Sequence, residues 1–341
     1  MNVSSAASAS DPAAVYHELI PLDRVGEWQA ALQEIPHAFG HTWENCRAMQ
    51  LSTGMDSYLY RFRTSDTTIV CPIAERVFLN HTDVVTPYGF SGFVGTGAHP
   101  QFPLLWKDFA RQQGWVCGYI GLNPILQRTL EQDDADMYTH SEVYVLDLTR
   151  EESDLLANLS TSRRRQLRDW ERSRSSVISD RQLLADFVLR EQEEFFRSRG
   201  AASVYRFSKE TWLFLFQLPN VLAFGAMSGS SLAAITLFAF TPTIGEYLFN
   251  ISTGDGARFS TPLLWHGVQS LRSLGVRFLN LGGGIRPGDG VAKFKQGFGG
   301  CALPLQSLRQ VYDPVIFARL CQETKVDPRG RSGYFPTYRA R

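Results

Sequence analysis

The sequence lacks the cysteine patterns on which disulfide-rich domains and zinc sites depend. Its five cysteines are scattered, odd in number, and contain no C-x-x-C pair. They offer neither a disulfide framework nor a zinc ligand set, so we expect no metal site and a reducing, cytoplasmic location.

The chain also lacks a charged apolar leader and an unbroken apolar run. Residues 1–14, MNVSSAASASDPAA, are typical of a disordered tail and not of a secretory signal. The most apolar stretch, Val221–Phe240, is interrupted by Gly225 and by the run S-G-S-S at residues 228–231. Glycine and serine between two β-rich runs are typical of a hairpin, so we expect two buried strands there and no membrane span.

The chain has no net excess of acidic or basic residues, but each half has one. Apolar residues make up 44% and charged residues 20% of the 341 residues, which excludes disordered and collagen-like classes and favours two globular domains. Residues 1–150 contain 9 basic and 17 acidic side chains, whereas the remainder contains 25 and 17. This asymmetry indicates an anionic ligand for the second half, or a drift in surface charge without function.

Hydrophobic periodicity predicts a mixed α/β architecture that divides near Arg150, since the composition shifts at Ser153. In the first half the pattern predicts helices over Leu22–Ile35, Trp43–Leu51 and Phe102–Gly114, and strands over Ser57–Arg63, Thr67–Arg76, Val77–Leu79, Trp115–Leu122 and Glu142–Leu148. In the second half it predicts helices over Asp154–Arg174, Asp180–Arg199, Thr211–Gln217 and Leu263–Leu274 and from Pro314, and strands over Val221–Met227, Leu232–Phe240, Glu246–Ser252, Arg277–Leu281 and Ala302–Val311.

The most distinctive segment is Leu279–Gly300, LNLGGGIRPGDGVAKFKQGFGG, which contains eight glycines. Consecutive glycines after a strand allow backbone amides to approach a ligand closely. Their spacing matches neither a Rossmann nor a P-loop motif. If K-F-K is extended, Lys293 and Lys295 lie on one side and Phe294 on the other. A plain glycine-rich turn with solvated lysines explains the same residues.

A second candidate is the arginine-rich run SRRRQLRDWERSR, predicted to be helical. At 3.6 residues per turn, Arg164, Arg168 and Arg172 share one face. Guanidinium groups bind phosphate in a bidentate manner, although a basic helix face is more often simply solvated.

Five segments, in order, resemble the Fem family, the non-ribosomal peptidyltransferases that build peptidoglycan cross-bridges, and the wider Fem-like branch of the GNAT N-acyltransferases. They are HTDVVTPYGFSG (81–92), LSTSRRRQLRDWERS (159–173), YLFNISTGDGARFSTPLLWHGVQSLRSLG (247–275), FLNLGGG with GVAKFKQGFGG (278–300), and YFPTYR (334–339). The likeness extends over nearly the whole chain from about residue 15.

The resemblance implies two GNAT-like domains side by side. The first, on the acceptor side, comprises residues 15–150 and 320–341, with Tyr334–Arg339 packed onto it; the second, on the acyl-donor side, comprises 151–319. We expect two separate sheets. In the GNAT fold two central strands splay apart, and we expect these to be Leu232–Phe240 and Glu246–Ser252.

The resemblance also implies site residues. Lys295 is the expected catalytic residue, either contacting phosphate or stabilising developing negative charge. The implied donor-binding residues are Phe294, Lys293, Gly254, Arg258 and Asn250, and the implied acceptor-binding residues are Asp83, Tyr88, Arg164, Arg168 and Tyr247. His140 and Glu142 are the best candidates for an acid–base pair, although a structural role for them is favoured.

The implied chemistry is amide formation between an activated acyl donor and an acceptor amine, with no tightly bound cofactor. Acyl-CoA or aminoacyl-tRNA is the expected co-substrate. The segment STGDGARFSTP (252–262) departs from the pyrophosphate signature [QR]-x-x-G-x-[GA], which makes aminoacyl-tRNA a competitive donor. The acceptor is a small molecule or a cell-envelope precursor, and the oligomeric state stays open. The alternatives are an acyl-CoA-dependent N-acetyltransferase acting on a sugar or metabolite amine, and a non-catalytic Fem-like binding module.

Overall fold

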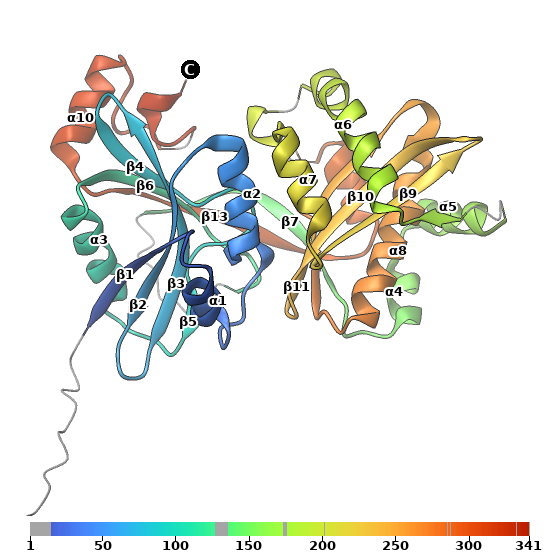
Figure 1. Ribbon diagram of the computed structural model, residues 1–341, viewed down its shortest axis with the longest axis horizontal. Coiled ribbons are helices and arrows are strands. Elements are labelled where there is room, and N and C mark those ends of the chain that lie inside the picture. Colours follow the sequence, from blue (N-terminus) through green and yellow to red (C-terminus); the bar gives the residue numbers. More distant parts are fainter. Residues whose placement is uncertain are drawn as a thin grey trace, which may run out of the picture.

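The computed structural model describes residues 15–126, 136–172, 176–200, 202–284, 286, 288–331 and 333–340. The predicted tail (1–14), the end of the predicted arginine-rich helix (173–175) and most of the acidic run 131–136 lie outside these residues. The molecule consists of two α/β halves that lie side by side (Figure 1), as the predicted fold class requires.

The first half is built from the following elements: β1 (Tyr16–Pro21), α1 (Val25–Leu32), η1 (Phe39–His41), α2 (Trp43–Thr53), β2 (Ser57–Arg63), β3 (Thr68–Phe78), β4 (His81–Val85), β5 (Val94–Thr96), α3 (Phe102–Gln112), β6 (Trp115–Gly121) and the start of β7 (Met137–Asp147). The C-terminal elements α10 (Pro314–Glu323) and η6 (Thr337–Arg339) return to this half (Figure 1).

The second half contains the remaining elements: α4 (Glu152–Asn158), α5 (Thr161–Arg172), β8 (Val177–Ile178), α6 (Arg181–Ser198), η4 (Ser203–Tyr205), α7 (Lys209–Gln217), β9 (Val221–Ser228), β10 (Ser231–Phe240), β11 (Ile244–Ser252), η5 (Gly254–Phe259), α8 (Ser260–Ser273), β12 (Phe278–Asn280), α9 (Gly290–Gln296) and β13 (Cys301–Val311). Val221–Phe240 forms a hairpin, as predicted, and no helix in the part of the chain that the structure describes is long and apolar enough to cross a membrane.

The two halves repeat one order of strands. In the first, β1 to β4 pair antiparallel, β4 pairs parallel with β6, and β6 pairs antiparallel with β13. In the second, β8 to β11 pair antiparallel, β11 pairs parallel with β12, and β12 pairs antiparallel with β7. Each half therefore has one parallel pair at its centre.

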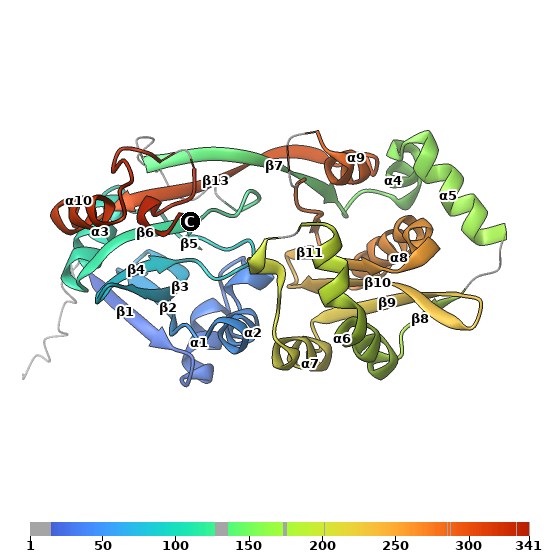
Figure 2. The ribbon, with the colours of Figure 1, turned by 90° about the horizontal axis from the view of Figure 1, so that it is seen from above.

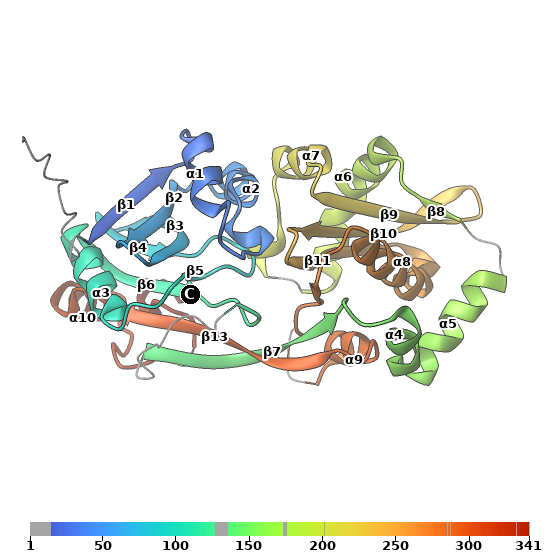
Figure 3. The same cartoon turned by 90° about the horizontal axis from the view of Figure 1, so that it is seen from below.

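The prediction of two separate sheets is wrong, because β7 and β13 join the halves into one sheet of thirteen strands. Both strands have eleven residues, a length of about 36 Å. They pair with each other across the boundary and run from one half into the other (Figures 2 and 3). The sequence predicted a strand only over Glu142–Leu148, because only the buried C-terminal end of β7 has an apolar pattern.

Side chains also hold the halves together. The Thr211 hydroxyl on α7 donates to the Ala48 carbonyl on α2 (2.8 Å). The same Thr211 hydroxyl lies 2.7 Å from the Ser52 hydroxyl on α2. In the core of the second half, Phe39 and Met49 from the first half pack beside α6 and α7. The domain boundary near Arg150 remains a prediction, since the two halves share both a sheet and a core.

Two local predictions near the glycine-rich segment are wrong. Lys293 and Lys295 lie on the helix α9 and not on a strand; the Asp289 carboxylate caps this helix by accepting from the Ala292 N–H (2.8 Å). Residues two apart on a helix point in nearly opposite directions, so the lysines do not share a side. The predicted helix from Asp154 is divided into α4 and α5, because the Ser160 N–H donates to the Gly297 carbonyl (2.9 Å).

Candidate active site

The parallel strands β11 and β12 open into a splay in the second half. They pair over only three rungs, the last of which joins Glu246 to Asn280. Beyond it, β11 continues to Ser252, whereas the chain after β12 turns away into Gly282–Gly284. The predicted splay between β10 and β11 is wrong, since these strands stay paired along their length. Periodicity identifies a strand but not its partner.

The equivalent place in the first half is closed. Beyond the last β4–β6 rung, the Thr86 hydroxyl accepts from the Gly121 N–H (3.0 Å), and the Thr86 N–H donates to the Tyr119 carbonyl (3.1 Å). Gly92 then packs so tightly against β6 that a Cβ on it would lie 2.6 Å from the Gly121 carbonyl oxygen. In the described residues, no backbone hydrogen bond closes the splay of the second half in this way.

Lys295 lies beside the open splay. Its ammonium donates to the Gly283 carbonyl (2.8 Å) and lies 5.8 Å from the centre of the Tyr247 ring. Burial lowers the pKa of Lys295 to about 8, although the Asp289 carboxylate acts in the opposite direction. The same burial raises the pKa of Tyr247. Lys295 is thus a cation that a small change in its surroundings can neutralise.

Gly282 fixes the position of this ammonium. Its φ is +70°, and a Cβ on it would lie 3.0 Å from Lys295 Nζ. We expect Gly282→Ala to displace Lys295 and to lower the rate of the catalysed reaction by about tenfold or more, because small displacements at reacting groups are costly. Gly288→Ala is the matched control: its φ is +67° but its Cβ would meet nothing within 4 Å. Equal rates for the two variants would contradict this placement.

Arg163 lies nearby, and we call Lys295, Tyr247, Phe294 and Arg163 together the Lys295 cluster. Its guanidinium lies 4.5 Å from the centre of the Phe294 ring and donates to the Thr261 hydroxyl (2.9 Å), while its buried Nε has no partner in the described residues. Burial lowers the pKa of this guanidinium. The sequence pattern favoured Arg164 and Arg168 as acceptor-binding residues and counted Arg163 only among the arginines of a tRNA-binding face, not beside Phe294. The signal was available, since Arg163 shares a helix face with Leu167 and Trp170, which pack inward.

Solved structures with this arrangement of strands identify the fold. A crystal structure of FemX superposes with a TM-score of 0.68 at 12% identity, covering 89% of this chain and 99% of that chain. The C-terminal domain of a putative lysylphosphatidylglycerol synthetase from Agrobacterium fabrum gives 0.55 at 14% identity, over 88% and 96%. L-PGS from Bacillus licheniformis gives 0.53 at 13% identity, over 85% and 93%.

The chain therefore has a FemX-like fold. The predicted mixed α/β class, with two halves side by side, is confirmed. Comparison with protein-family models and with curated proteins gives no match.

The predicted donor residues do not gather at one place. Phe294 packs against the hydrophobic core of the second half, as does Tyr247, which was predicted to bind the acceptor, whereas Lys293 is exposed on α9. Asn250 is engaged within the fold: its amide donates to the Thr236 hydroxyl (2.7 Å) and accepts from the Ser260 hydroxyl (3.1 Å).

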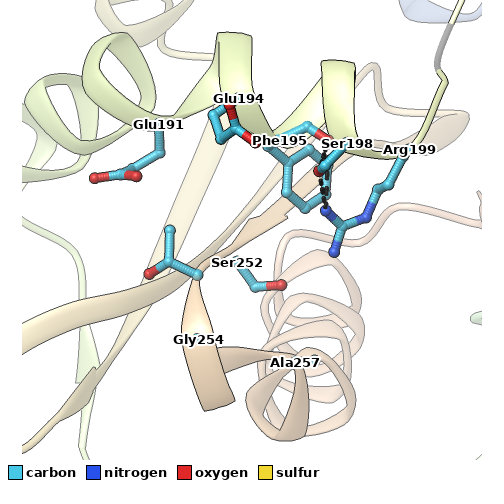
Figure 4. A pocket seen from close by; sticks show the side chains of 9 residues that line it. Glu191, Glu194, Phe195, Ser198, Arg199, Ser252, Gly254 and Ala257 are labelled. Carbon is cyan, nitrogen blue, oxygen red and sulfur yellow. Dashed lines mark hydrogen bonds between the residues drawn. The ribbon is translucent and has the colours of Figure 1, made fainter.

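Gly254 and Arg258 lie on η5, apart from the Lys295 cluster. Arg258 is ion-paired with Asp255 (2.9 Å) and exposed. Gly254 lines a cavity of about 300 Å³ between η5 and α6. Figure 4 shows this cavity with Phe195 and Arg199 on its wall. Its lining includes no residue of the Lys295 cluster.

The predicted acceptor residue Tyr88 serves as an anchor between the domains. Its ring comes from the first half and inserts among three rings of the second, Tyr205, Phe207 and Phe249, with centroids 5.7, 5.6 and 6.4 Å away. Asn45 holds the loop by donating to the Tyr88 carbonyl (2.9 Å).

Of the predicted acceptor residues on α5, Arg168 is exposed and Arg164 is half-buried. The Arg164 guanidinium donates to the Ala157 carbonyl at the end of α4 (2.9 Å). Neither arginine contacts the Lys295 cluster through an interaction that the described residues show, so any role in binding an acceptor stays a prediction.

Asp83, also predicted to line the acceptor pocket, is fully buried, and both of its carboxylate oxygens have partners. Its carboxylate pairs with Arg76 (2.6 Å) and Arg339 (2.7 Å) and accepts from the Tyr338 hydroxyl (2.9 Å). Arg339 and Tyr338 belong to the C-terminal segment, so Asp83 ties that segment to β4. The structure assigns it to this cluster and not to a pocket.

His140 and Glu142 do not form an acid–base pair. His140 lies in a β-bulge of β7, and burial lowers its pKa. Glu142 instead accepts from the Tyr144 hydroxyl (2.5 Å), which raises the pKa of that tyrosine. Among the described residues, no group of three or more His, Cys, Asp or Glu side chains could hold a metal ion.

Proposed function

We propose that this protein is an acyl or aminoacyl transferase that forms an amide bond between an activated acyl donor and an acceptor amine. The observation that carries the proposal is the Lys295 ammonium beside the open β11–β12 splay, while the equivalent splay of the first half is closed. The second half is then available to hold a donor, and the first half supports the second.

The chemistry follows from the charges at the splay. Attack of an amine on an ester or thioester places negative charge on the carbonyl oxygen. With a pKa of about 8, Lys295 is largely protonated at neutral pH and can stabilise that charge or a donor phosphate. The unpaired edge of β11, Tyr247–Ser252, offers backbone N–H and C=O groups that could align the donor.

Aminoacyl-tRNA is the donor that the surface favours. The outer face of α5 exposes Arg165, Arg168 and Arg172, a basic surface suited to a polyanion. The loop expected to bind the pyrophosphate of acyl-CoA is used otherwise: Arg258 is paired with Asp255, and a Cβ on Gly256 would lie 2.0 Å from the Ala233 carbonyl oxygen. The lack of a side chain at Gly256 therefore allows this loop to pack closely against β10. Acyl-CoA is the second donor to be tested.

The proposal is tested by offering both donors to the protein. Charged tRNA and an acyl-CoA mixture are incubated separately with the protein and a mixture of amine acceptors, including sugar amines and cell-envelope precursors. Mass spectrometry then follows loss of donor and gain of an amide product. Protein-dependent amide formation with either donor supports the proposal. Binding of a donor without any turnover would favour the non-catalytic binding module instead.

A tRNA donor predicts binding that depends on the α5 arginines. We expect the triple variant Arg165→Ala, Arg168→Ala, Arg172→Ala to bind charged tRNA more weakly and with a shallower dependence on salt. The log–log slope should become less negative by up to about 0.9 for each phosphate that the variant no longer neutralises. Filter binding at several salt concentrations measures the slope.

The control for this variant is Arg190→Ala with Arg197→Ala on α6, two exposed arginines of the same half. The control removes positive charge from the second half but leaves α5 intact, so we expect it to keep the parental slope. Parent affinity that is equal at low and high salt would rule out tRNA.

A further inference from the structure

Two buried polar side chains at the apex of the splay lack partners. Glu246 and Asn280 are each 1% exposed, and they face each other across the last rung of the parallel pair. Neither carboxylate oxygen of Glu246 nor the Asn280 Nδ2 has a hydrogen-bond partner in the part of the chain that the structure describes. Buried polar groups are nearly always hydrogen-bonded, so an unpaired acceptor beside an unpaired donor needs an explanation.

The orientation of Asn280 is fixed by the splay itself. Its Oδ1 accepts from the Gly282 N–H (2.8 Å), the residue whose Cα faces the Lys295 ammonium. This bond identifies the oxygen and leaves the Nδ2 as a donor. The unpaired donor is therefore held within two residues of the glycines that position Lys295.

The surroundings of Glu246 are neutral. The groups that face it are the Tyr88 phenol, the Asn280 amide and the backbone of Phe39 and Gly40, whose N–H groups are close enough to lower its pKa but form no hydrogen bond of normal geometry. Burial outweighs them and raises the pKa of Glu246 to about 8. A carboxyl with a pKa near the working pH is suited to exchange protons.

We infer that Glu246 and Asn280 form the subsite for the reacting groups, with Glu246 accepting the proton of the attacking amine and Asn280 Nδ2 donating to the acyl carbonyl oxygen. This inference rests on the proposed function. An unpaired acceptor next to an unpaired donor complements an amine attacking a carbonyl, which presents a donor and an acceptor side by side. The ligand class is a primary amine together with an acyl ester or thioester.

Atoms and electrons balance in this step without a further reactant. The amine lone pair forms the C–N bond while the carbonyl π electrons move to oxygen, where the hydrogen bond from Asn280 Nδ2 stabilises the charge. One amine proton passes to the Glu246 carboxylate. Collapse of the intermediate breaks the C–O or C–S bond, and the leaving alkoxide or thiolate takes up one proton, supplied through solvent as Glu246 releases its own.

The conservative variant Glu246→Gln tests the role with two nucleophiles. With the donor that the parent protein uses, we expect the rate with an alkylamine to fall about a hundredfold or more. With hydroxylamine, whose nitrogen is far more acidic than that of an alkylamine once it has attacked the carbonyl, water can accept the proton and we expect a loss of only a few-fold. We also expect the rise of the parent's kcat/KM with pH toward about 8 to disappear in the variant. The control is Glu75→Gln in the first half, where the carboxylate accepts from Trp115 Nε1 (2.7 Å).

Stability provides an independent readout. Because the folded pKa of Glu246 lies above its ordinary value of 4.5, the native state binds more protons between pH 4.5 and about 8, and the free energy of unfolding falls as pH rises through that window. Glutamine does not ionise, so Glu246→Gln should melt several degrees higher than the parent above pH 8 and at about the same temperature near pH 4.5.

The outcomes separate the two proposals. A variant that is more stable at high pH yet slow with alkylamines supports the inference, since a purely structural residue would not gain stability while losing turnover. Full turnover of Glu246→Gln with an alkylamine overturns the inference alone, as does an equal loss with both nucleophiles. Absence of transfer by the parent with every donor overturns the proposed function, and the inference with it.

Discussion

Replacing Lys295 by alanine is expected to lower the rate of acyl transfer at least a hundredfold while leaving the protein folded. The variant removes the one ammonium at the described splay that lies over the Tyr247 ring and is held by the Gly283 carbonyl. Loss of a group that stabilises the oxyanion typically raises the barrier by about 3 kcal/mol. Single-turnover kinetics with the donor identified by mass spectrometry measure the effect, and circular dichroism verifies the fold.

Lys293→Ala is the matched control for this result. Lys293 lies on the same short helix, two residues away, but its side chain is exposed. It has the same side chain on the same helix but no contact with the splay in the described residues, so we expect its loss to change the rate only a few-fold. Full turnover by Lys295→Ala, or an equal loss in both variants, would contradict the assignment of Lys295.

Asp83→Ala is expected to reduce the free energy of unfolding by about 4 kcal/mol, the usual cost of removing one member of a buried ion pair. The substitution leaves the Arg76 and Arg339 guanidinium groups unpaired and removes the acceptor of the Tyr338 hydroxyl. Because two of these partners lie in the C-terminal segment, its release should accompany the loss. Urea denaturation measures the stability, and limited proteolysis shows the released segment.

Asp108→Ala provides the comparison. Asp108 pairs with Arg111 at the surface, where both side chains are more than half exposed, and such pairs contribute little. We expect its effect on stability to be within about 0.5 kcal/mol. An Asp83→Ala protein with parental stability and an altered KM for the acceptor would restore the acceptor-pocket role that the family resemblance implied.

The sequence predicted where helices and strands lie better than it predicted which strands pair with each other. The strand over Ser57–Arg63 has the predicted bounds, because aromatic residues recur at every second position in SYLYRFR. The same reasoning misread K-F-K as a strand, since a seven-residue helix capped by Asp289 is too short to show helical periodicity. It also missed the exposed end of β7, where the apolar pattern is absent.

The candidate site was predicted where one segment carries it and missed where several segments combine. Lys295 and Phe294 come from one motif and lie beside the splay. Glu246 and Asn280 are neighbours only because β11 and β12 pair in parallel, and a pairing between residues 34 positions apart in the chain leaves no local signal. Periodicity could have separated Arg163 from Arg164, since only the former shares the apolar face of α5.

Hydrogen–deuterium exchange tests most directly whether an acyl donor binds at the β11–β12 splay beside Lys295. The exchange of backbone amides is compared with and without the donor that supports transfer. We predict slower exchange at the unpaired edge Tyr247–Ser252 and over Gly282–Lys295, with no change at Val85–Phe90 beside the closed splay of the first half. Protection at Val85–Phe90 with none at Tyr247–Ser252 would contradict binding at this splay.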